Sequence, residues 1–435
     1  MQTPWGVAPK NQVFGDAARS VRQAAGAARS FAEAGAGMAK ASIEQGVEKV
    51  RAKVDTDGMA WPTPPAFGGA PGSGAYMLPP APALCGPLPP LEIRLCSWNM
   101  HGSPVDSRDD LLDWIASAEG RLADVVVLGI QELVELGARS VVLGGSGDSE
   151  RQAALEARVE EAFRRRLSSA GGEHMVKVCS FGMVGLALTV YMREGLRPYL
   201  ADVDCDRVKT GVEGMAGNKG CVCARMRLGE MSLCFVNVHL ASGHNAVNER
   251  NAHLAQVLAD AFQGTSQKGA VRPPKLGFQR RSVYHVPLHH FSVVMGDFNI
   301  RLDTGKDESW PSGPEQSWLS RDQLLLGLMP TLRGFREGLI SFPPTYKYQR
   351  GSTSFNTSRC PAWCDRVVFR TEFGTEAELL EYDSYKELKH TSDHRPVAAH
   401  FEVWLPNNGQ QKQPEPGTSL PAAQQPPAAT AWPVI

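Results

Sequence analysis

Acidic, amide and imidazole side chains stand at or near the ends of hydrophobic runs at six places along this sequence. In a folded sheet, strand ends and the loops after them present polar groups to a ligand. We therefore expect the six places to converge on one site, although each would be ordinary alone. Their polar residues are Asn99; Gln131 and Glu132; Asn237 and His239; Asp297 and Asn299; Asp365; and Asp393 and His394.

These residue types restrict the chemistry of such a site. Carboxylate and amide oxygens without a Cys/His cluster favour a hard, hydrated cation such as Mg²⁺ over zinc. Hydrolysis of a phosphate monoester needs such a cation, a base that positions or deprotonates water, and donors around the phosphoryl oxygens. The sequence has no Walker-type glycine loop, kinase signature or G-x-S-x-G elbow. It therefore predicts attack by water rather than transfer from a nucleotide.

The elements that must position these residues alternate along the chain. Short apolar runs predict strands, and apolar residues at helical spacing predict amphipathic helices between them. This alternation indicates an α/β or α+β domain. The predicted strands are 91–98, 124–130, 184–191, 232–238, 291–295, 366–370 and 397–404, and the predicted helices are 109–117, 149–167 and 248–261.

Composition along the 435 residues predicts one large domain with weak flanks. Hydrophobic residues make up 42% and charged residues 21%, which allows a sizeable core. We place the catalytic domain at 91–405. Residues 1–58 form an Ala-rich segment that favours helix, either solvated or resting on anionic lipid. Residues 59–90 are a Pro/Gly-rich linker, and 406–435 are a disordered Pro/Gln-rich tail.

Several classes of protein are disfavoured by charge and cysteine content. A net charge of −1 without a strong basic patch argues against a nucleic-acid partner. Nine cysteines without a secreted context predict free thiols, and Cys360 and Cys364 have no second ligand pair for zinc. No apolar run reaches the ~20 residues of a membrane-spanning helix. We expect a cytoplasmic protein, soluble or peripheral at a membrane.

The motifs together resemble the inositol polyphosphate 5-phosphatase domain across roughly residues 91–405. Their order and content match that family throughout. The stretches Gly296–Arg301 and Pro361–Arg366 are the most specific. The motifs are Ser97-Trp98-Asn99-Met100-His101-Gly102, Gly129-Ile130-Gln131-Glu132, Gly217-Asn218-Lys219-Gly220, Gly296-Asp297-Phe298-Asn299-Ile300-Arg301, Pro361-Ala362-Trp363-Cys364-Asp365-Arg366 and Ser392-Asp393-His394-Arg395-Pro396-Val397.

The resemblance implies the endonuclease/exonuclease/phosphatase superfamily and its DNase I-like fold. That fold is an α+β, four-layer α/β/β/α sandwich of two packed mixed β-sheets flanked by helices. It also implies roles for individual residues. Glu132 and Asn99 would hold Mg²⁺, and Asp297 would activate the attacking water. The remaining catalytic positions would be Asn299 and His239 as donors, His394 ordered by Asp393, and Asp365 in the surrounding polar network.

Substrate phosphates beyond the scissile one need charge partners of their own. The resemblance assigns this task to Lys219, Asn218, Tyr346, Lys347, Arg359 and Arg366. The segment before Pro361 is shorter than in phosphoinositide-acting members and retains only Arg359, which puts the choice between lipid and soluble inositol phosphates in question. An acid-free insertion at 264–285 carries five basic residues and is either a solvated loop or a contact with anionic membrane.

Two other functions remain open from the sequence. Abasic-site endonucleases and sphingomyelinases share the Asn, Glu, Asp-x-Asn and Asp-His positions, but are not expected to carry the Pro361–Arg366 motif. A catalytically inactive phosphoinositide-binding scaffold, with Pro-rich flanks that recruit partner proteins, is the alternative outside the enzyme class.

Overall fold

The strands of the computed structural model form two mixed sheets. The structure describes residues 76–77, 88–134, 146–210, 219–263, 285–305, 310–372 and 374–406, all within one compact unit, Ala66–Ile435. The first sheet has seven strands in the order β1-β4-β5-β3-β2-β13-β12. Its strands are β1 (Tyr76–Met77), β2 (Leu91–Asn99), β3 (Val125–Gln131), β4 (Met175–Met183), β5 (Leu186–Arg193), β12 (Glu376–Ser384) and β13 (Val397–Trp404).

The second sheet has six strands in the order β10-β11-β9-β8-β7-β6. They are β6 (Leu200–Lys209), β7 (Gly220–Leu228), β8 (Met231–His239), β9 (Phe291–Asp297), β10 (Arg336–Glu337) and β11 (Asp365–Thr371). In each sheet, one central pair is parallel, β2 with β3 and β8 with β9, and the other pairs are antiparallel. Short 3₁₀ helices lie at η1 (Glu194–Tyr199), η3 (Val286–Leu288), η4 (Glu315–Arg321) and η5 (Pro330–Leu332).

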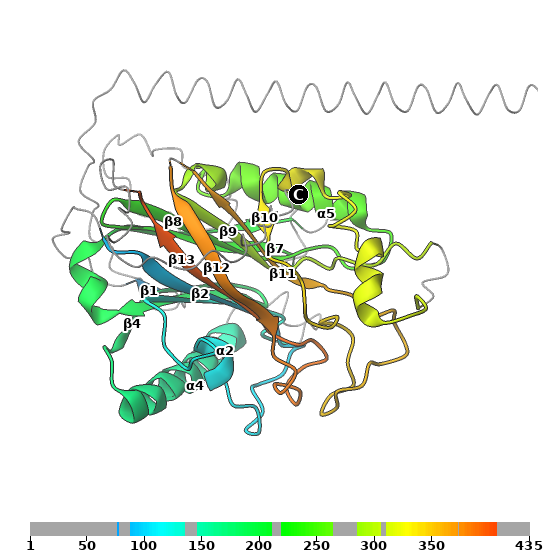
Figure 1. The fold of residues 1–435 in the computed structure, drawn as a ribbon, viewed down its shortest axis with the longest axis horizontal. Helices are drawn as coiled ribbons and strands as arrows, with labels where there is room; N and C mark the ends of the chain where they lie inside the picture. The colour runs from blue at the N-terminus through cyan, green and yellow to red at the C-terminus, as the bar shows by residue number, and fades with distance from the viewer. Residues whose placement is uncertain are drawn as a thin grey trace, which may run out of the picture. The chain divides into compact units, whose positions relative to one another are not determined.

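Helices cover the outer faces of the two sheets (Figure 1). On the first sheet lie α2 (Leu112–Ile115) and α4 (Ser146–Ala170), and on the second lies α5 (Val247–Asp260). The helix α4 buries Leu155, Val159 and Phe163 at helical spacing against this sheet. The layers are therefore helix, sheet, sheet and helix, as the resemblance implied.

Three apolar clusters hold these layers together. The largest lies between the sheets and joins Leu95 and Val127 of the first sheet to Phe235 and Val293 of the second. The others fill the spaces under α2 and α4 and under α5. Each central strand is buried on both faces, which explains why its sequence is a continuous hydrophobic run rather than an alternating pattern.

All seven predicted strands are present, and two of the three predicted helices have nearly the predicted bounds. The predicted helix 109–117 is wrong in extent, because only Leu112–Ile115 are helical. The carboxylate of Asp109 instead accepts hydrogen bonds from the backbone of His390 and Thr391. We did not predict β1, β4, β6, β7, β10 or β12, and β1 lies within the segment 59–90 that we expected to be a linker. The strand β12 is an edge strand whose side chains are mostly half-exposed or exposed.

Among the described helices, none is long and apolar enough to cross a membrane. All eight cysteines in the described ranges are free thiols, as expected. The basic insertion at 264–285, apart from His285, and the segments 1–58 and 407–435 lie outside the described residues.

Candidate active site

Strand register brings the polar motifs to one edge of the two sheets. Asn99 at the end of β2 pairs with Gln131 at the end of β3. His239 at the end of β8 pairs with Asp297 at the end of β9. Asp365, which begins the antiparallel strand β11, also pairs with Asp297. Because parallel strands end at the same edge, residues far apart in sequence become neighbours.

Two glycines allow the backbones to approach closely here. Gly296 has φ of 137°, and a Cβ at this position would lie 2.1 Å from the carbonyl oxygen of Val238 in β8. A Cβ on Gly129 would lie 2.8 Å from the Met295 methyl group of the facing sheet. Any side chain at these positions would push apart the strands that carry Asp297 and Glu132.

Asp297 is the hub of the site. Its buried carboxylate accepts hydrogen bonds from the side-chain amides of Asn99 at 3.0 Å and Asn299 at 3.2 Å, and from the Asn299 backbone N–H at 2.8 Å. Burial raises the pKa of Asp297, but its neighbours His394, His239 and Lys219 and the donor Asn99 outweigh burial, so the pKa is lowered. Asp297 is thus held ionised by partners from both sheets.

A neutral histidine lies between the two sheets' carboxylates. His239 Nε2 is 3.6 Å from Glu132 Oε1, 3.5 Å from Asp297 Oδ2 and 2.5 Å from Lys219 Nζ. Burial and the Lys219 ammonium lower the pKa of His239 to about 4. A neutral imidazole can accept a hydrogen bond from Lys219, so the positive charge in this cluster lies on the lysine.

His394 carries the opposite protonation state. Its Nδ1 lies 2.8 Å from Asp365 Oδ2, which also accepts a hydrogen bond from Thr345 Oγ1 at 2.7 Å. Burial disfavours the imidazolium, but the carboxylates of Asp365, Asp297 and Asp393 outweigh burial and raise the pKa of His394 to about 9. His394 is therefore a fixed cation beside Asp297 at neutral pH.

The partner expected for His394 was wrong. Its sequence neighbour Asp393 does not order the imidazole. Instead, Asp393 Oδ1 lies 3.5 Å from His101 Nδ1, and its Oδ2 lies 3.8 Å from Lys347 Nζ. Asp393 and His394 lie in a bend before β13, and their side chains meet different partners there. Asp365 lies on the correct side because β11 begins there.

Three site residues have strained backbones. His101, Glu132 and Asn299 have φ of 49°, 47° and 53°, and they are three of the five non-glycine residues with positive φ in the described ranges. Side chains disfavour this region, and such strain gathers at functional sites. Each of these residues directly follows, or lies two residues after, the end of a central strand, where the chain must turn to aim the side chain into the site.

A buried amide pair braces the sheets behind the site. Gln131 Nε2 donates to Asn237 Oδ1 at 2.6 Å, and Asn237 Nδ2 donates to the carbonyls of Ile130 and Ala187, each at 2.9 Å. Gln131 directly precedes Glu132, and Asn237 lies two residues before His239. The brace therefore sets the spacing between the strands that carry those two side chains.

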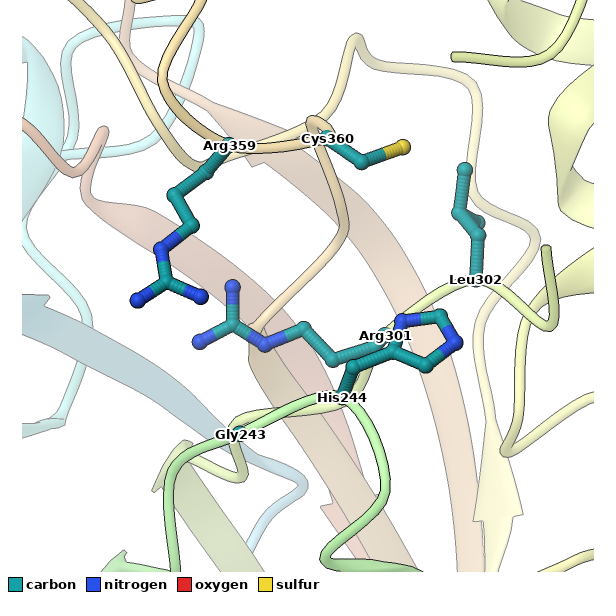
Figure 2. A pocket seen from close by; sticks show the side chains of 6 residues that line it. All are labelled: Gly243, His244, Arg301, Leu302, Arg359 and Cys360. Atoms are coloured by element: carbon teal, nitrogen blue, oxygen red, sulfur yellow. The ribbon is translucent and has the colours of Figure 1, made fainter. Parts of the chain in front are cut away.

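Three predicted substrate residues, Tyr346, Lys347 and Arg359, lie on two neighbouring segments. The Tyr346 ring packs on His394 with centroids 4.5 Å apart, and Lys347 keeps about a quarter of its side chain exposed. Arg359 lines a pocket with Arg301 and His244, and Figure 2 shows both guanidinium groups extending into the same space. Asn218 lies outside the described residues.

Arg366 is corrected as a substrate residue. Its side chain has no exposed surface and bonds the buried carboxylates of Asp322 at 3.0 Å and Glu337 at 2.6 Å. Substrate cannot reach it. Arg366 follows Asp365 in β11 and points to the other side of that strand, where it ties β11 to β10 and to Asp322, next to the end of η4.

We did not assign His101, Arg301 or Thr345 to the site. His101 Nδ1 lies 3.6 Å from Glu132 Oε2, and the side chain is half exposed. His101 and Arg301 occur inside the motifs quoted above, two residues after Asn99 and Asn299 respectively. Their positions in those motifs could have identified them from the sequence. Thr345 lies in the stretch that supplies Tyr346 and Lys347, but its contact with Asp365 depends on how that stretch folds against β11.

The donor set fits a hard cation at Glu132. The carboxylate of Glu132 retains 28% exposure and has only imidazoles, His101 and His239, within ion-pair distance in the described chain. Burial raises the pKa of Glu132, but His101 and His239 outweigh burial, so the pKa lies below its usual value. With the oxygens of Asn99 and Asp297 nearby, these oxygen ligands suit Mg²⁺.

A second group of ligand atoms is less suited to a metal. Atoms of Asp297, Asp365 and His394 lie within 4.8 Å of one another. Metal binding needs a deprotonated imidazole, whereas His394 is protonated through Asp365. The oxygens of Glu132 and Asn99 therefore suit a hard cation better than this group does.

Comparison with known proteins agrees with this fold and site. The sequence model of Endonuclease/Exonuclease/phosphatase family 2 matches residues 96–400. The chain belongs to the endonuclease/exonuclease/phosphatase family.

Within the family, the resemblance to the inositol polyphosphate 5-phosphatase domain is confirmed. The chain is 32% identical to Synaptojanin of Caenorhabditis elegans over 72% of this chain and 28% of that protein. It is 30% identical to Inositol-1,4,5-trisphosphate 5-phosphatase 1 of Schizosaccharomyces pombe over 72% of this chain and 27% of that protein. The chain thus spans about a quarter of the length of these relatives.

A solved structure is similar to most of the domain. It is the inositol polyphosphate 5-phosphatase domain of a synaptojanin in complex with inositol (1,4)-bisphosphate and calcium ion. The match has a TM-score of 0.57 and 28% sequence identity, and it covers 73% of this chain and 86% of that one.

Proposed function

We propose that this chain is an Mg²⁺-dependent phosphatase that hydrolyses the 5-phosphate monoester of inositol polyphosphates or phosphoinositides. One observation carries the proposal: an ionised Asp297, held by Asn99 and Asn299, shares the site with the carboxylate of Glu132 and with an imidazolium at His394. This arrangement offers a base and a cationic donor to one phosphoryl group. The names of the relatives and the inositol bisphosphate in the similar structure agree with it.

Each side chain has a task in the displacement. Mg²⁺ bound by Glu132 and Asn99 would neutralise charge on the phosphate. Asp297 takes a proton from the attacking water as the water oxygen bonds to phosphorus. The bond from phosphorus to the inositol oxygen breaks. The His394 imidazolium donates a hydrogen bond to a phosphoryl oxygen, where charge develops, and one N–H of the Asn299 amide would leave the Leu240 carbonyl to donate to another. The departing inositol oxygen is protonated from solvent.

The remaining substrate phosphates would meet Lys219, Tyr346, Lys347 and Arg359, with Asn218 beside Lys219. Of these, Lys347 has its Nζ 5.9 Å from the centre of the Tyr346 ring, and Arg359 lines a pocket with Arg301. With Arg359 as the one basic residue in its shortened segment, we expect soluble inositol phosphates to be preferred over lipids. Peripheral membrane contact and Pro-rich-motif-binding partners belong to the flanks and the 264–285 insertion, and they remain proposals.

The test is phosphate release by the purified full chain, with and without Mg²⁺. Inositol 1,4,5-trisphosphate is offered beside vesicles containing phosphatidylinositol 4,5-bisphosphate or phosphatidylinositol 3,4,5-trisphosphate. We expect chelation to abolish release and Asp297→Ala to lower kcat by about 10³-fold or more. Asp383→Ala, at an exposed acid of β12, is the matched control.

The alternatives give different results. A binding scaffold would bind the vesicles without releasing phosphate, and Asp297→Ala would leave that binding unchanged. Release from an abasic-site DNA or from sphingomyelin, but from no inositol compound, would assign the chain to another branch of the superfamily. Ranking the soluble and lipid substrates measures what the shortened Arg359 segment excludes.

A further inference from the structure

A buried arginine of helix α5 reaches from the outer layer to the strand ends that carry the site. Arg250 has no exposed surface, and its Nη1 donates to the carbonyls of Ala241 at 3.2 Å and Gly243 at 2.8 Å. Its Nη2 donates to Gln323 Oε1 at 2.6 Å. The guanidinium therefore holds the loop after β8 and the segment after η4 at once.

The Arg250 guanidinium is buried without an ion pair. In the described part of the chain, no carboxylate lies within ion-pair distance of it. Burial and the neighbouring Arg301 lower the pKa of Arg250 to about 10, so the side chain is still charged at neutral pH. A buried charge without a counter-ion costs stability, and costs of this kind gather at functional sites. What Arg250 holds in place is therefore of interest for the reaction.

One route from Arg250 leads to the NH₂ end of the Asn299 amide. Asn299 Nδ2 donates to the Leu240 carbonyl at 3.1 Å, and the Leu240 N–H donates to the Asp297 carbonyl at 3.0 Å. Leu240 directly precedes Ala241, whose carbonyl Arg250 holds. The guanidinium thus fixes the loop whose carbonyl the Asn299 N–H leaves when it turns toward the substrate.

A second route leads to the oxygen end of the same amide. Gln323 Oε1 also accepts from the Arg301 N–H at 3.2 Å, and the Gln323 N–H donates to the Arg301 carbonyl at 3.0 Å. Arg301 Nη2 in turn donates to Asn299 Oδ1 at 2.6 Å. Gln323 Nε2 donates to the His244 carbonyl at 3.1 Å, and Figure 2 shows His244 beside Arg301. Both ends of the Asn299 amide therefore lead back to Arg250 and Gln323.

We propose that Arg250 and Gln323 are positioning residues that form a buried clamp between the loops after β8 and β9 and so orient the Asn299 amide. The inference rests on the proposed function and deepens it, because this amide is one of the donors to the phosphoryl group. Both side chains are buried, so substrate cannot reach them. Loss of the clamp should therefore lower kcat and leave KM nearly unchanged.

The experiment measures kcat and KM of the full chain with inositol 1,4,5-trisphosphate and Mg²⁺. Arg250→Met should lower kcat about 10- to 100-fold and change KM less than about threefold. Arg250→Lys keeps the charge but loses the planar fork that reaches three acceptors. Its kcat should therefore be closer to that of Arg250→Met than to that of the wild type. Wild-type kcat in Arg250→Lys would show that the charge acts alone, and the clamp would be refuted.

Gln323 offers a matched pair of variants that leaves the arginine in place. Gln323→Glu keeps the oxygen that accepts from Arg250 and from the Arg301 N–H, and it should keep kcat within about threefold of wild type. Gln323→Met keeps the shape without that oxygen, and it should lower kcat about as much as Arg250→Met. This pair also decides the inference if Arg250→Met does not fold. Equal losses of kcat in both Gln323 variants contradict the clamp.

Two controls separate the orientation of the amide from the stability of the fold. Asn251 follows Arg250 in α5, and its Nδ2 donates to the Leu328 carbonyl at 2.8 Å. Asn251→Ala therefore loosens the same helix from the same segment without touching either loop, and it should lower Tm but not kcat. In an Asn299→Ala background, Arg250→Met and Gln323→Met should lower kcat no further, since the group they act through is gone.

The inference and the proposed function fail differently. Three results with an active wild type overturn the inference alone: the clamp variants raise KM instead of lowering kcat, Asn251→Ala lowers kcat as much as they do, or their losses add to that of Asn299→Ala. A folded wild type that releases no phosphate from any inositol compound overturns the proposed function and the inference with it.

Discussion

At the scale of single residues, the site is a set of charges whose protonation states are decided by burial and by partners. Asp297 is kept ionised, His239 is kept neutral with a pKa of about 4, and His394 is kept protonated with a pKa of about 9. Two histidines a few ångströms from one carboxylate thus hold opposite states. The difference follows from their other neighbours, the Lys219 ammonium for His239 and the Asp365 carboxylate for His394.

This difference predicts a pH effect of Asp365→Asn. The Asp365 carboxylate raises the pKa of His394, so the donor is present below the raised pKa and lost as pH rises through it. Removing that charge lowers the pKa of His394, and the alkaline limb of the kcat profile should move to lower pH. The measurement is kcat between pH 6 and about 10 for both proteins.

Asp393→Asn is the comparison variant for that pH profile, because Asp393 faces His101 and Lys347 rather than the imidazole of His394. Its alkaline limb should move less than that of Asp365→Asn. An equal or larger shift in Asp393→Asn would restore the pairing expected from the sequence and contradict the geometry.

At the scale of elements, strand β11 has two different faces. Asp365 points toward the site, and Arg366 points into a buried ion network with Asp322, Glu337 and the Tyr382 hydroxyl. This network joins β11 to β10, to β12 and to the segment after η4. Its role is to hold the start of β11, and with it Asp365, at a fixed place against β9.

We therefore predict that Arg366→Met destabilises the fold. It leaves two buried carboxylates without their cation, which costs about 3–5 kcal/mol of the free energy of unfolding. Arg370→Met on the same strand removes a partly exposed ion pair with Glu372 and should cost at most about 1 kcal/mol. Urea unfolding of both variants measures the two costs, and similar values for both would contradict the structural role of Arg366.

At the scale of the whole molecule, the apolar clusters between the sheets and under the helices are formed by described residues between positions 88 and 406. The described catalytic and binding candidates all lie within this range. The relatives extend well beyond the matched region.

A chain limited to residues 88–406 should therefore fold and retain kcat/KM for soluble inositol phosphates within about twofold. If the flanks contact anionic membrane, removing them should weaken binding to anionic vesicles without lowering activity on soluble substrates. If the 264–285 insertion does so, changing its lysines and arginines to serine in the full chain should have the same effect. A large loss of activity on the soluble substrate after truncation would show that the domain boundaries at 91 and 405 are wrong.

What the sequence determined by itself was local. Continuous apolar runs predicted the central strands, because burial on both faces requires apolar side chains at every position. The residue types at the strand ends predicted a site for a hard cation, since the oxygens of Asp297, Glu132 and Asn99 suit one. The resemblance of the motifs predicted the superfamily. The edge strand β12 was missed because only part of its surface is buried, which leaves a weaker pattern.

What only the tertiary structure decided was which side chains face each other. Asp365 replaced Asp393 as the partner of His394, and Arg366 proved to be buried, because side-chain direction depends on strand register rather than on nearness in sequence. The link from Arg301 to Asn299 and Tyr346 likewise depends on a segment more than 40 residues away folding back over β9. Spacing along a chain identifies the ligands of a site, whereas the packing of two sheets decides their partners.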